Sequence, residues 1–377
     1  MKDPDSARLP REQISTGTPP PGLTTALRSM MLKASVPGVS VAVVDRDRVV
    51  FAGGYGLADL AARSPATAST TYLWFSMTKM VTATAALRLA DDGRLDLATP
   101  VGEYVDYLRG PGKVQPSVGQ LLTHTSGLGN PLPIRWAHAA EAAPPDPEAL
   151  LRKLMARRRA YRYPVGQMAR YSNVGYLAAG QIISAAAGMP YEDYARKSVL
   201  QPLGMHNTGF RQPTGAATAK GYLKAPRIAD PLLRRLLPPG IAGDRYRAYL
   251  SLNPFHVDGP AYGGLAGDVL DAAKFLRMHL RNGDLDGKRV LTPESARRMR
   301  VIEHAGEPFA HGIGWFRRSP DSTTPWVEHF GTGVGFWNVM RLYPDHGMGV
   351  VIMSNSTAAY DFEPLMELLV GASWQKP

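Results

Sequence analysis

Short apolar runs separated by turn residues mark the two ends of the chain. Near the N-terminus, residues 39–44 and 49–52 are rich in β-branched side chains and flank a polar turn, which predicts a β-hairpin. Near the C-terminus, four further apolar runs alternate with turn signals. They predict antiparallel strands at residues 312–316, 327–330, 336–342 and 349–353.

Between these runs the apolar positions recur at the helical spacing. That spacing predicts helices at residues 77–90, 174–187, 191–200 and 269–280, and two more near the ends at 23–34 and 362–370. Strands at both ends with helices between them predict an α+β fold. The N- and C-terminal strands would form one antiparallel sheet flanked by helices, with a mainly helical region inserted.

The same pattern predicts the domain boundaries. Residues 1–21 are rich in Pro, Thr and charge, so we expect a flexible N-terminal arm. We assign residues 22–75 and 261–377 to a sheet domain and residues 76–260 to a mainly helical domain. We expect an active-site cleft at their junction.

Composition narrows the function classes. The chain has 377 residues, enough to bury a sizeable core, and no apolar run long enough to span a membrane. The arm lacks the apolar core of a secretory signal, which predicts a cytoplasmic location. The chain has no cysteine, which excludes disulfides and cysteine nucleophiles. The net charge of +11 permits an anionic partner, but no nucleic-acid recognition motif accompanies it, so we expect no nucleic-acid binding.

We expect neither a metal nor a cofactor. The chain contains no HExxH motif and no Walker phosphate loop, and its nine histidines do not fall at metal-ligand spacings. The glycine-rich residues 331–335 lead into a predicted strand, whereas a dinucleotide loop leads from a strand into a helix.

A first candidate for chemistry is Ser76-Met77-Thr78-Lys79, at the start of a predicted helix. Positions three apart share one helix face, so Lys79 would lie beside Ser76. The aromatic and methionine neighbours suggest a dry site, where desolvation lowers the pKa of a lysine and lets it accept a proton. The alternative is a helix-capping serine followed by a solvated lysine.

Two further motifs contain polar side chains of catalytic type. In Tyr171-Ser172-Asn173, the tyrosine can act as a base only if a neighbouring positive charge such as Lys79 depresses its pKa. The alternative here is an ordinary turn and helix cap. In His329-Phe330-Gly331-Thr332, the Thr332 N–H can serve as an oxyanion donor opposite the Ser76 N–H, and the glycine lets a ligand approach closely. The alternative is a histidine that ends a strand.

The three motifs, in this order, resemble those of the serine β-lactamase-like superfamily, which includes class C β-lactamases, D-alanyl-D-alanine peptidases, D-aminopeptidases and family VIII carboxylesterases. The resemblance covers about residues 25–370 and extends to the segments 121–128, 171–176, 202–205 and 262–265. It implies a β-lactamase/transpeptidase-like fold and an acyl-enzyme mechanism without a cofactor.

The resemblance also implies a role for each residue. Ser76 matches the acylated nucleophile, and Lys79 matches the lysine that activates it. Tyr171 matches the tyrosine that passes the proton to the leaving group, and Asn173 its polar companion. Thr332 matches the residue whose N–H completes the oxyanion hole with that of Ser76. His329-Phe330-Gly331 stands where β-lactamases have Lys-Thr-Gly.

That histidine changes the expected substrate. A neutral histidine holds a carboxylate less well than a lysine, which weakens the case for a β-lactamase or a peptidase of terminal D-alanine. In the family that the chain resembles, histidine at this place is familiar in D-aminopeptidase-like and esterase-like members. We therefore expect a serine carboxylesterase of the EC 3.1.1 type, closest to family VIII, that acts on small or medium esters with weak β-lactam hydrolysis. The alternatives are a D-aminopeptidase or amidase, a β-lactamase, and a non-catalytic penicillin-recognising sensor or scaffold. The oligomeric state is not predicted.

The segment 231–253 is the least typical part of the chain. It combines leucines, arginines and a proline pair. Three interpretations remain open: a flexible apolar wall over the cleft, a short amphipathic helix packed on the body, and a membrane-surface patch.

Overall fold

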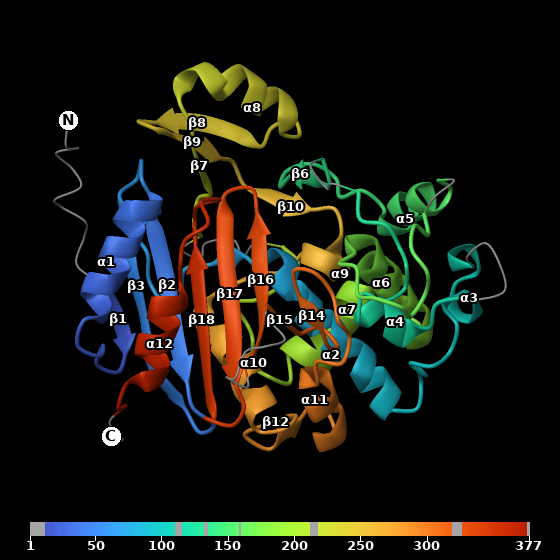
Figure 1. Ribbon diagram of the computed structural model, residues 1–377. Helices are drawn as coiled ribbons and strands as arrows, with labels where there is room; N and C mark the ends of the chain where they lie inside the picture. The colour runs from blue at the N-terminus through green and yellow to red at the C-terminus, as the bar shows by residue number, and fades with distance from the viewer. Residues whose placement is uncertain are drawn as a thin grey trace.

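A broad antiparallel sheet joins the two ends of the chain in the computed structural model (Figure 1). The structure describes residues 12–109, 115–131, 135–157, 160–211, 218–318 and 326–374. Within these residues the sheet has the order β1-β3-β2-β18-β17-β16-β15-β14, and β4 pairs with β3. The strands are β1 Gln13–Thr16, β2 Gly38–Val44, β3 Val49–Asp59, β4 Ser64–Pro65, β14 Ala310–His311, β15 Phe316–Arg317, β16 Val327–Gly333, β17 Phe336–Tyr343 and β18 Met348–Ser354.

The N- and C-terminal strands meet at the centre of this sheet. Strand β18 pairs antiparallel with β2, with Ile352 opposite Val41. The expected α+β fold, with a sheet built from both ends of the chain, is therefore confirmed. Strand β2 is buried along its whole length because helices cover both faces of the sheet.

Two hydrophobic clusters lie on the two faces of the sheet. Val41 packs in a cluster with helices α1 (Leu23–Ala34) and α12 (Glu363–Gly371). Ala42 points the other way, into the larger cluster that includes helix α10 (Val269–Leu280). This alternation follows from the two-residue repeat of a strand.

The larger cluster continues into a helical region beside the sheet. Helix α2 (Thr78–Asp91) lies between the sheet and the other helices, and nearly all of its residues are buried. Around it are α3 Val101–Tyr104, α4 Val118–Leu122, α5 Pro147–Met155, α6 Asn173–Ala187, α7 Tyr191–Ala195, α9 Pro260–Gly263 and α11 Pro293–Arg300. Helices α6 and α9 both contact α2, and these contacts form one side of the site described below.

Small sheets and one short helix complete the fold. Helix α8 (Asp230–Leu236) lies with a three-stranded sheet of order β7-β9-β8 at the top of Figure 1. The short strands are β5 Tyr72–Leu73, β6 Ala137–Ala139, β7 Tyr222–Lys224, β8 Ala242–Tyr246, β9 Tyr249–Leu252, β10 Phe255–Val257, β11 Ala266–Gly267, β12 Asp284–Leu285 and β13 Lys288–Arg289. Within the described residues, no helix is both long and apolar enough to cross a membrane.

The expected helix at 191–200 is confirmed: it begins as α7 and continues as a π-helix over Arg196–Leu200. Two local predictions were wrong. Of the expected strand at 312–316, only Phe316 lies in a strand, and the residues before it form the turn between β14 and β15, because the Gly312 N–H bonds to the Trp315 carbonyl and Gly314 has a positive φ. Part of the expected flexible arm, β1, pairs with β3. Residues 1–11 of that arm lie outside the described residues.

Candidate active site

Ser76 lies in a tight turn at the entrance to helix α2. A short 3₁₀ helix, Phe75–Met77, leads directly into the α-helix at Thr78. Phe75 has a φ of 46°, a left-handed conformation that is strained for a bulky residue. Ser76 therefore follows a sharp turn, and Lys79 lies one helical turn further along the same face.

Lys79 is completely buried beside Ser76. Its Nζ lies 3.1 Å from Ser76 Oγ, and it donates hydrogen bonds to Asn173 Oδ1 at 2.8 Å and to the Tyr262 carbonyl at 2.9 Å. Burial holds the pKa of Lys79 well below its usual value. A neutral amine has two N–H bonds and one lone pair. In a neutral Lys79 the two carbonyl oxygens would take the two N–H bonds, which would leave the lone pair for the Ser76 hydroxyl.

Tyr171 lies on the other side of the same pair. It is hydrogen-bonded to Ser76, and Lys79 Nζ lies 4.9 Å from the centre of its ring. Burial raises the pKa of Tyr171, although the bond to Ser76 lowers it in part. The depressed tyrosine pKa considered from the sequence is therefore not found. With a neutral Lys79, the proton stays on the phenol.

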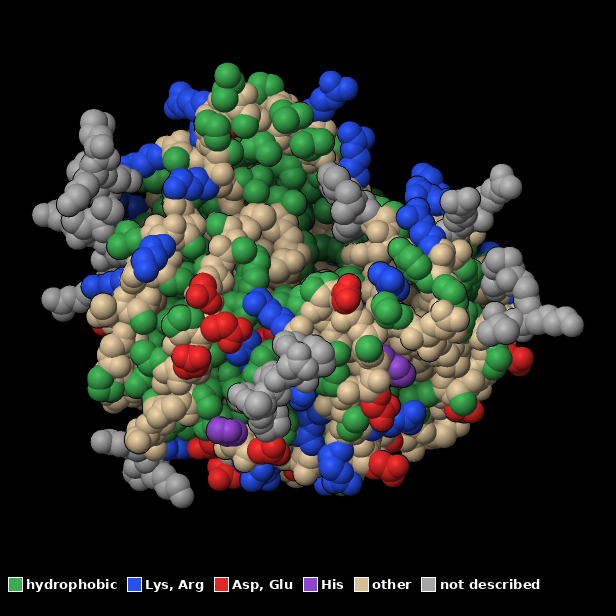
Figure 2. Space-filling view, in the orientation of Figure 1, with side chains coloured by type: hydrophobic (Ala, Val, Ile, Leu, Met, Phe, Trp, Pro, Cys, Tyr) green, Lys and Arg blue, Asp and Glu red, His purple; other side chains and the backbone are tan. Residues whose placement is uncertain are grey.

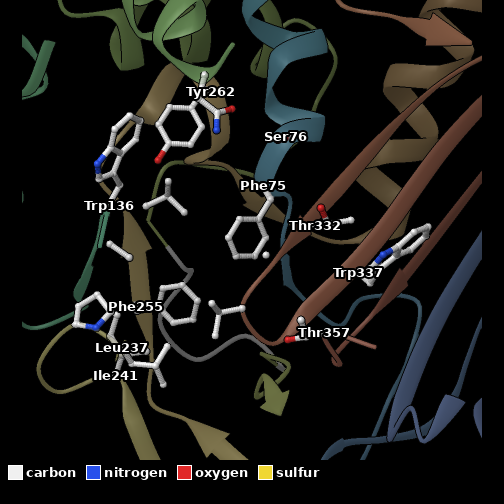
Figure 3. A pocket seen from close by; sticks show the side chains of 16 residues that line it. Phe75, Ser76, Trp136, Leu237, Ile241, Phe255, Tyr262, Thr332, Trp337 and Thr357 are labelled. Carbon is white, nitrogen blue, oxygen red and sulfur yellow. The ribbon is translucent and has the colours of Figure 1, made fainter. Parts of the chain in front are cut away.

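Strand β16 packs against the Ser76 turn through its glycines. A Cβ on Gly331 would lie 1.9 Å from the Trp74 carbonyl oxygen, and one on Gly333 would meet the Phe75 ring. Only glycine permits so close an approach. Ser76 and Thr332 consequently line the same cavity (Figure 3).

His329 lies away from that cavity. Its side chain is buried, its Nδ1 is 2.7 Å from the Phe330 carbonyl, and its ring centre is 6.3 Å from that of Tyr171. Burial, together with the nearby Lys79, holds the pKa of His329 well below its usual value. The structure thus brings together Ser76, Lys79, Tyr171, Asn173 and Thr332, and it places a neutral His329 outside the residues that line the cavity.

Three groups around this site were not identified from the sequence. The Tyr262 carbonyl binds Lys79, but a backbone oxygen has no signature in residue type. The ring of His124 lies 4.5 Å from that of Tyr171, and its Nδ1 accepts the Ser172 N–H. His311 contacts His124, and burial lowers its pKa to about 4. The only sequence signal that pointed to His124 was the segment 121–128, which resembles the serine β-lactamase-like superfamily. In the described part of the chain, no group of three potential metal ligands occurs.

A cavity of about 500 Å³ opens in front of Ser76. Its polar side chains are Ser76, Asn173, Tyr262, Thr332 and Thr357. The rest of its lining is apolar, and none of its described lining residues is acidic or basic. The apolar residues are Phe75, Trp136, Ala137, Leu237, Pro238, Ile241, Phe255, Val257, Val334 and Trp337.

Comparison with known proteins identifies the family of the chain. The model of the Beta-lactamase family matches residues 23–371. The chain belongs to the beta-lactamase family. The resemblance inferred from the motifs is therefore confirmed at the level of the family.

Individual relatives are distant. Protein flp from Staphylococcus aureus (strain COL) is 25% identical over 343 residues, which cover 90% of this chain but only 63% of that protein. The chain thus spans less than two thirds of the length of this relative. The octameric penicillin-binding protein homologue from Pyrococcus abyssi is 25% identical, with a TM-score of 0.74 over 93% of this chain and 77% of that one. The D-amino acid amidase from Ochrobactrum anthropi SV3, at 23% identity, shares the fold with a TM-score of 0.73 over 93% and 96%.

Proposed function

We propose that this member of the beta-lactamase family is a serine hydrolase that cleaves small or medium carboxylic esters through an acyl-enzyme. The observation that carries the proposal is the cavity in front of Ser76, whose described lining has no charged side chain. An uncharged ester leaves no ionic group unpaired there, whereas burying an unpaired charge is costly.

The contacts of Lys79 supply the first step. Its lone pair accepts the Ser76 proton while Oγ attacks the ester carbonyl carbon. The backbone N–H groups of Ser76 and Thr332 are the proposed donors to the resulting oxyanion. When the carbon–oxygen bond to the alcohol breaks, the leaving oxygen takes a proton from the Tyr171 hydroxyl, which Lys79 then replaces.

The second step reverses the same proton path. A water molecule attacks the acyl carbon and gives up a proton to Lys79. The bond to Ser76 Oγ breaks, and the serine regains a proton as the free acid leaves. No metal or cofactor takes part in this sequence.

The cavity also weighs against the alternative substrates. A D-amino acid amide has an ammonium group, which calls for an acidic partner, and a penicillin has a carboxylate, which calls for a cation. Neither partner occurs among the described lining residues. His329, neutral and buried, does not supply the missing cation.

A panel of three substrates tests the proposal. Purified protein is given p-nitrophenyl butyrate, D-phenylalanine amide and a chromogenic cephalosporin. We expect the ester to be turned over fastest, and Ser76→Ala to lose at least about 10³-fold of that activity. The exposed Ser69 provides a matched control, and Ser69→Ala should retain full activity.

The other outcomes point to the other functions. Faster turnover of the amide would indicate an amidase, and faster turnover of the cephalosporin would indicate a β-lactamase. Acylation of Ser76 by a β-lactam without turnover of any substrate would indicate a sensor. Each of these results would contradict the esterase proposal.

A further inference from the structure

Residues 222–252 form a lobe over the mouth of the active-site cavity. We call this segment the α8 lobe; it contains β7, α8, β8 and β9 and forms the top of the molecule in Figure 1. On its inner side, Leu237 and Ile241 belong to the main hydrophobic core and also line the cavity. Figure 3 shows both of them next to Phe255. The lobe is therefore a wall of the site.

The outer side of the lobe is apolar as well. Ile228, Leu232 and Leu236 are 89%, 60% and 44% exposed. They are four residues apart on a continuous helical segment, because the 3₁₀ turn Arg227–Ala229 leads directly into α8. That spacing places all three on one face.

This clustering is unusual on the surface of the protein. Among the described residues, eight large apolar side chains are exposed, and three of them fall within these nine positions. Single exposed apolar residues need no explanation, but a contiguous group marks a site of interaction. The buried core does not account for this group, since Leu237 already anchors the helix from below.

Positive charge surrounds the exposed leucine face. Residues 224–247 contain six Lys or Arg and only two Asp, and one of these, Asp230, is paired with Arg245. A shallow recess beside α8 is lined by Lys224, Arg227, Arg245 and Arg247. In Figure 2, Lys and Arg side chains stand at the rim of the apolar lobe at the top of the molecule. Arg227 belongs to this recess and directly precedes Ile228, so the basic and apolar surfaces are continuous.

We propose that the α8 lobe docks on an anionic lipid surface. Ile228, Leu232 and Leu236 enter the boundary of the acyl chains, and the surrounding cations contact the headgroups. The combination of an apolar helix face with a basic rim fits such a surface by charge as well as by polarity. The net charge of +11, which the catalytic site does not use, favours the same partner.

Docking in this way defines the source of the substrate. This part of the inference rests on the proposed esterase function. Because Leu237 and Ile241 of the lobe line the same cavity as Ser76, docking of the lobe brings that cavity close to esters dissolved in the lipid. The substrate class is then uncharged esters that partition into an anionic interface.

A second copy of the chain fits this face less well. A symmetric pair would place the same patch against itself, with Arg227 and Arg235 of both copies crowded into one contact. Such like-charge contacts oppose association. A projecting tip of nine residues also offers less area than a stable protein interface, which buries about 800 Å² on each partner.

Vesicle flotation tests the docking directly. The full chain is mixed with vesicles of phosphatidylglycerol and phosphatidylcholine, or of phosphatidylcholine alone. We expect binding to the anionic vesicles to be at least about tenfold stronger and to fall steeply between about 50 mM and 500 mM salt. The double variant Ile228→Ser, Leu232→Ser should lower this binding about tenfold, and Arg227→Gln with Arg235→Gln should weaken it as well.

The controls separate docking from folding and from catalysis. Leu32 on helix α1 is 55% exposed, close to the 60% of Leu232, so Leu32→Ser is a matched variant that should bind as the unaltered protein does. The α8 variants should hydrolyse a water-soluble short-chain ester normally but lose rate on an ester dissolved in anionic vesicles. Ser76→Ala should still float with the vesicles.

Three results would overturn the inference. One is no binding to anionic vesicles at low salt, and another is equal loss of binding in the Leu32 and α8 variants. The third is a dimer that the α8 variant dissociates while lipid binding is absent, which would assign the face to a second copy. Vesicle binding without hydrolysis of any ester would contradict the proposed function alone.

Discussion

At the scale of single residues, Lys79 determines what the site can do. Its side chain is fully buried, and its two donated hydrogen bonds go to carbonyl oxygens that have no net charge. In such surroundings the neutral amine is the stable form. We propose that this lowered pKa lets the lysine accept the Ser76 proton during catalysis, which a solvated lysine does not do.

Replacing this lysine should separate catalysis from stability. We expect Lys79→Met to lower kcat/KM for the ester at least about 10³-fold, because the base is lost. The thermal unfolding temperature should stay level or rise, since a buried polar group is replaced by an apolar one of similar length. Steady-state kinetics and calorimetry on the same sample check both effects. A large fall in stability would instead show that the amine is a structural element.

A buried histidine should make the stability depend on pH. Burial lowers the pKa of His311 from 6.5 to about 4, so between these values the unfolded chain binds a proton that the folded chain does not. Its contribution is present above pH 6.5 and is lost as the pH falls to 4, a change of about 3 kcal/mol. Urea unfolding at pH 7.5 and pH 4.5 should show that His311→Phe loses less stability on acidification than the unaltered protein. An equal loss would contradict this assignment.

The sequence predicted the site at this scale only in part. The proximity of side chains within a short motif could be predicted, because the helical spacing places Lys79 beside Ser76. The contact between Lys79 and the Tyr262 carbonyl could not be predicted, because Tyr262 lies far from Lys79 in the sequence and the contacting atom belongs to the backbone. The raised pKa of Tyr171 also depends on burial by distant segments. Residue type alone does not contain this information.

At the scale of elements, the contact between β16 and the Ser76 turn holds the two proposed oxyanion donors in place. Gly331 lies against the Trp74 carbonyl, so the strand cannot move closer and a side chain cannot be added without displacing it. The motif was recognised from the sequence, but its packing role was not, because the partner is a backbone oxygen 257 positions away in the chain.

A single added methyl group tests this contact. We expect Gly331→Ala to destabilise the protein by about 2 kcal/mol through overpacking and to lower kcat at least about tenfold by shifting Thr332. Gly371→Ala is the control, because a Cβ there meets no atom within 4 Å. Denaturant titration and ester kinetics provide the readouts. Unchanged kcat in Gly331→Ala would argue against a role of Thr332 in the oxyanion hole.

The errors at this scale have a local cause. Residues 312–316 alternate in the manner of a strand, but Gly312 and Gly314 bend the backbone into a turn. Residues 231–253 left three interpretations open because leucines on both sides of a short helix fit a wall, a packed helix and a surface patch alike. The structure shows that no residue of α8 itself is buried and that Leu237 and Ile241, which follow the helix, lie in the cavity wall. The lipid-facing role of α8 is our further inference.

At the scale of the whole molecule, the sheet that joins the two ends of the chain was predictable. Its central strands have long β-branched runs, and the buried helices have clear periodicity. The small sheets were not predictable, because strands of two to five residues are too short to show a recognisable alternation of apolar and polar side chains. The pairing of β2 with β18, across some 300 residues, was not predicted, because no local signal marks which strands of the two ends lie side by side.

A buried ionic network ties the C-terminal helix to this sheet. Arg341 on β17 bonds to Glu328 on β16 and to Glu363 on α12, with Arg341 and Glu328 almost completely buried. We expect Arg341→Met to cost about 3–5 kcal/mol, because it removes both hydrogen bonds to the buried Glu328 carboxylate and leaves it only the longer ion pair with Arg318, at 3.6 Å. Adding Glu328→Met should restore part of that loss, as measured by urea unfolding. No recovery in the double variant would contradict the ionic explanation.

The most direct test of the account is to find where the acyl group goes. The protein is mixed with p-nitrophenyl butyrate, quenched within the first turnovers and digested, and the peptides are examined by mass spectrometry. We predict a butyryl group on Ser76, formed in the unaltered protein and absent in Lys79→Met. A butyryl group on another residue, or ester hydrolysis with Ser76 unmodified in both proteins, would contradict the central claim.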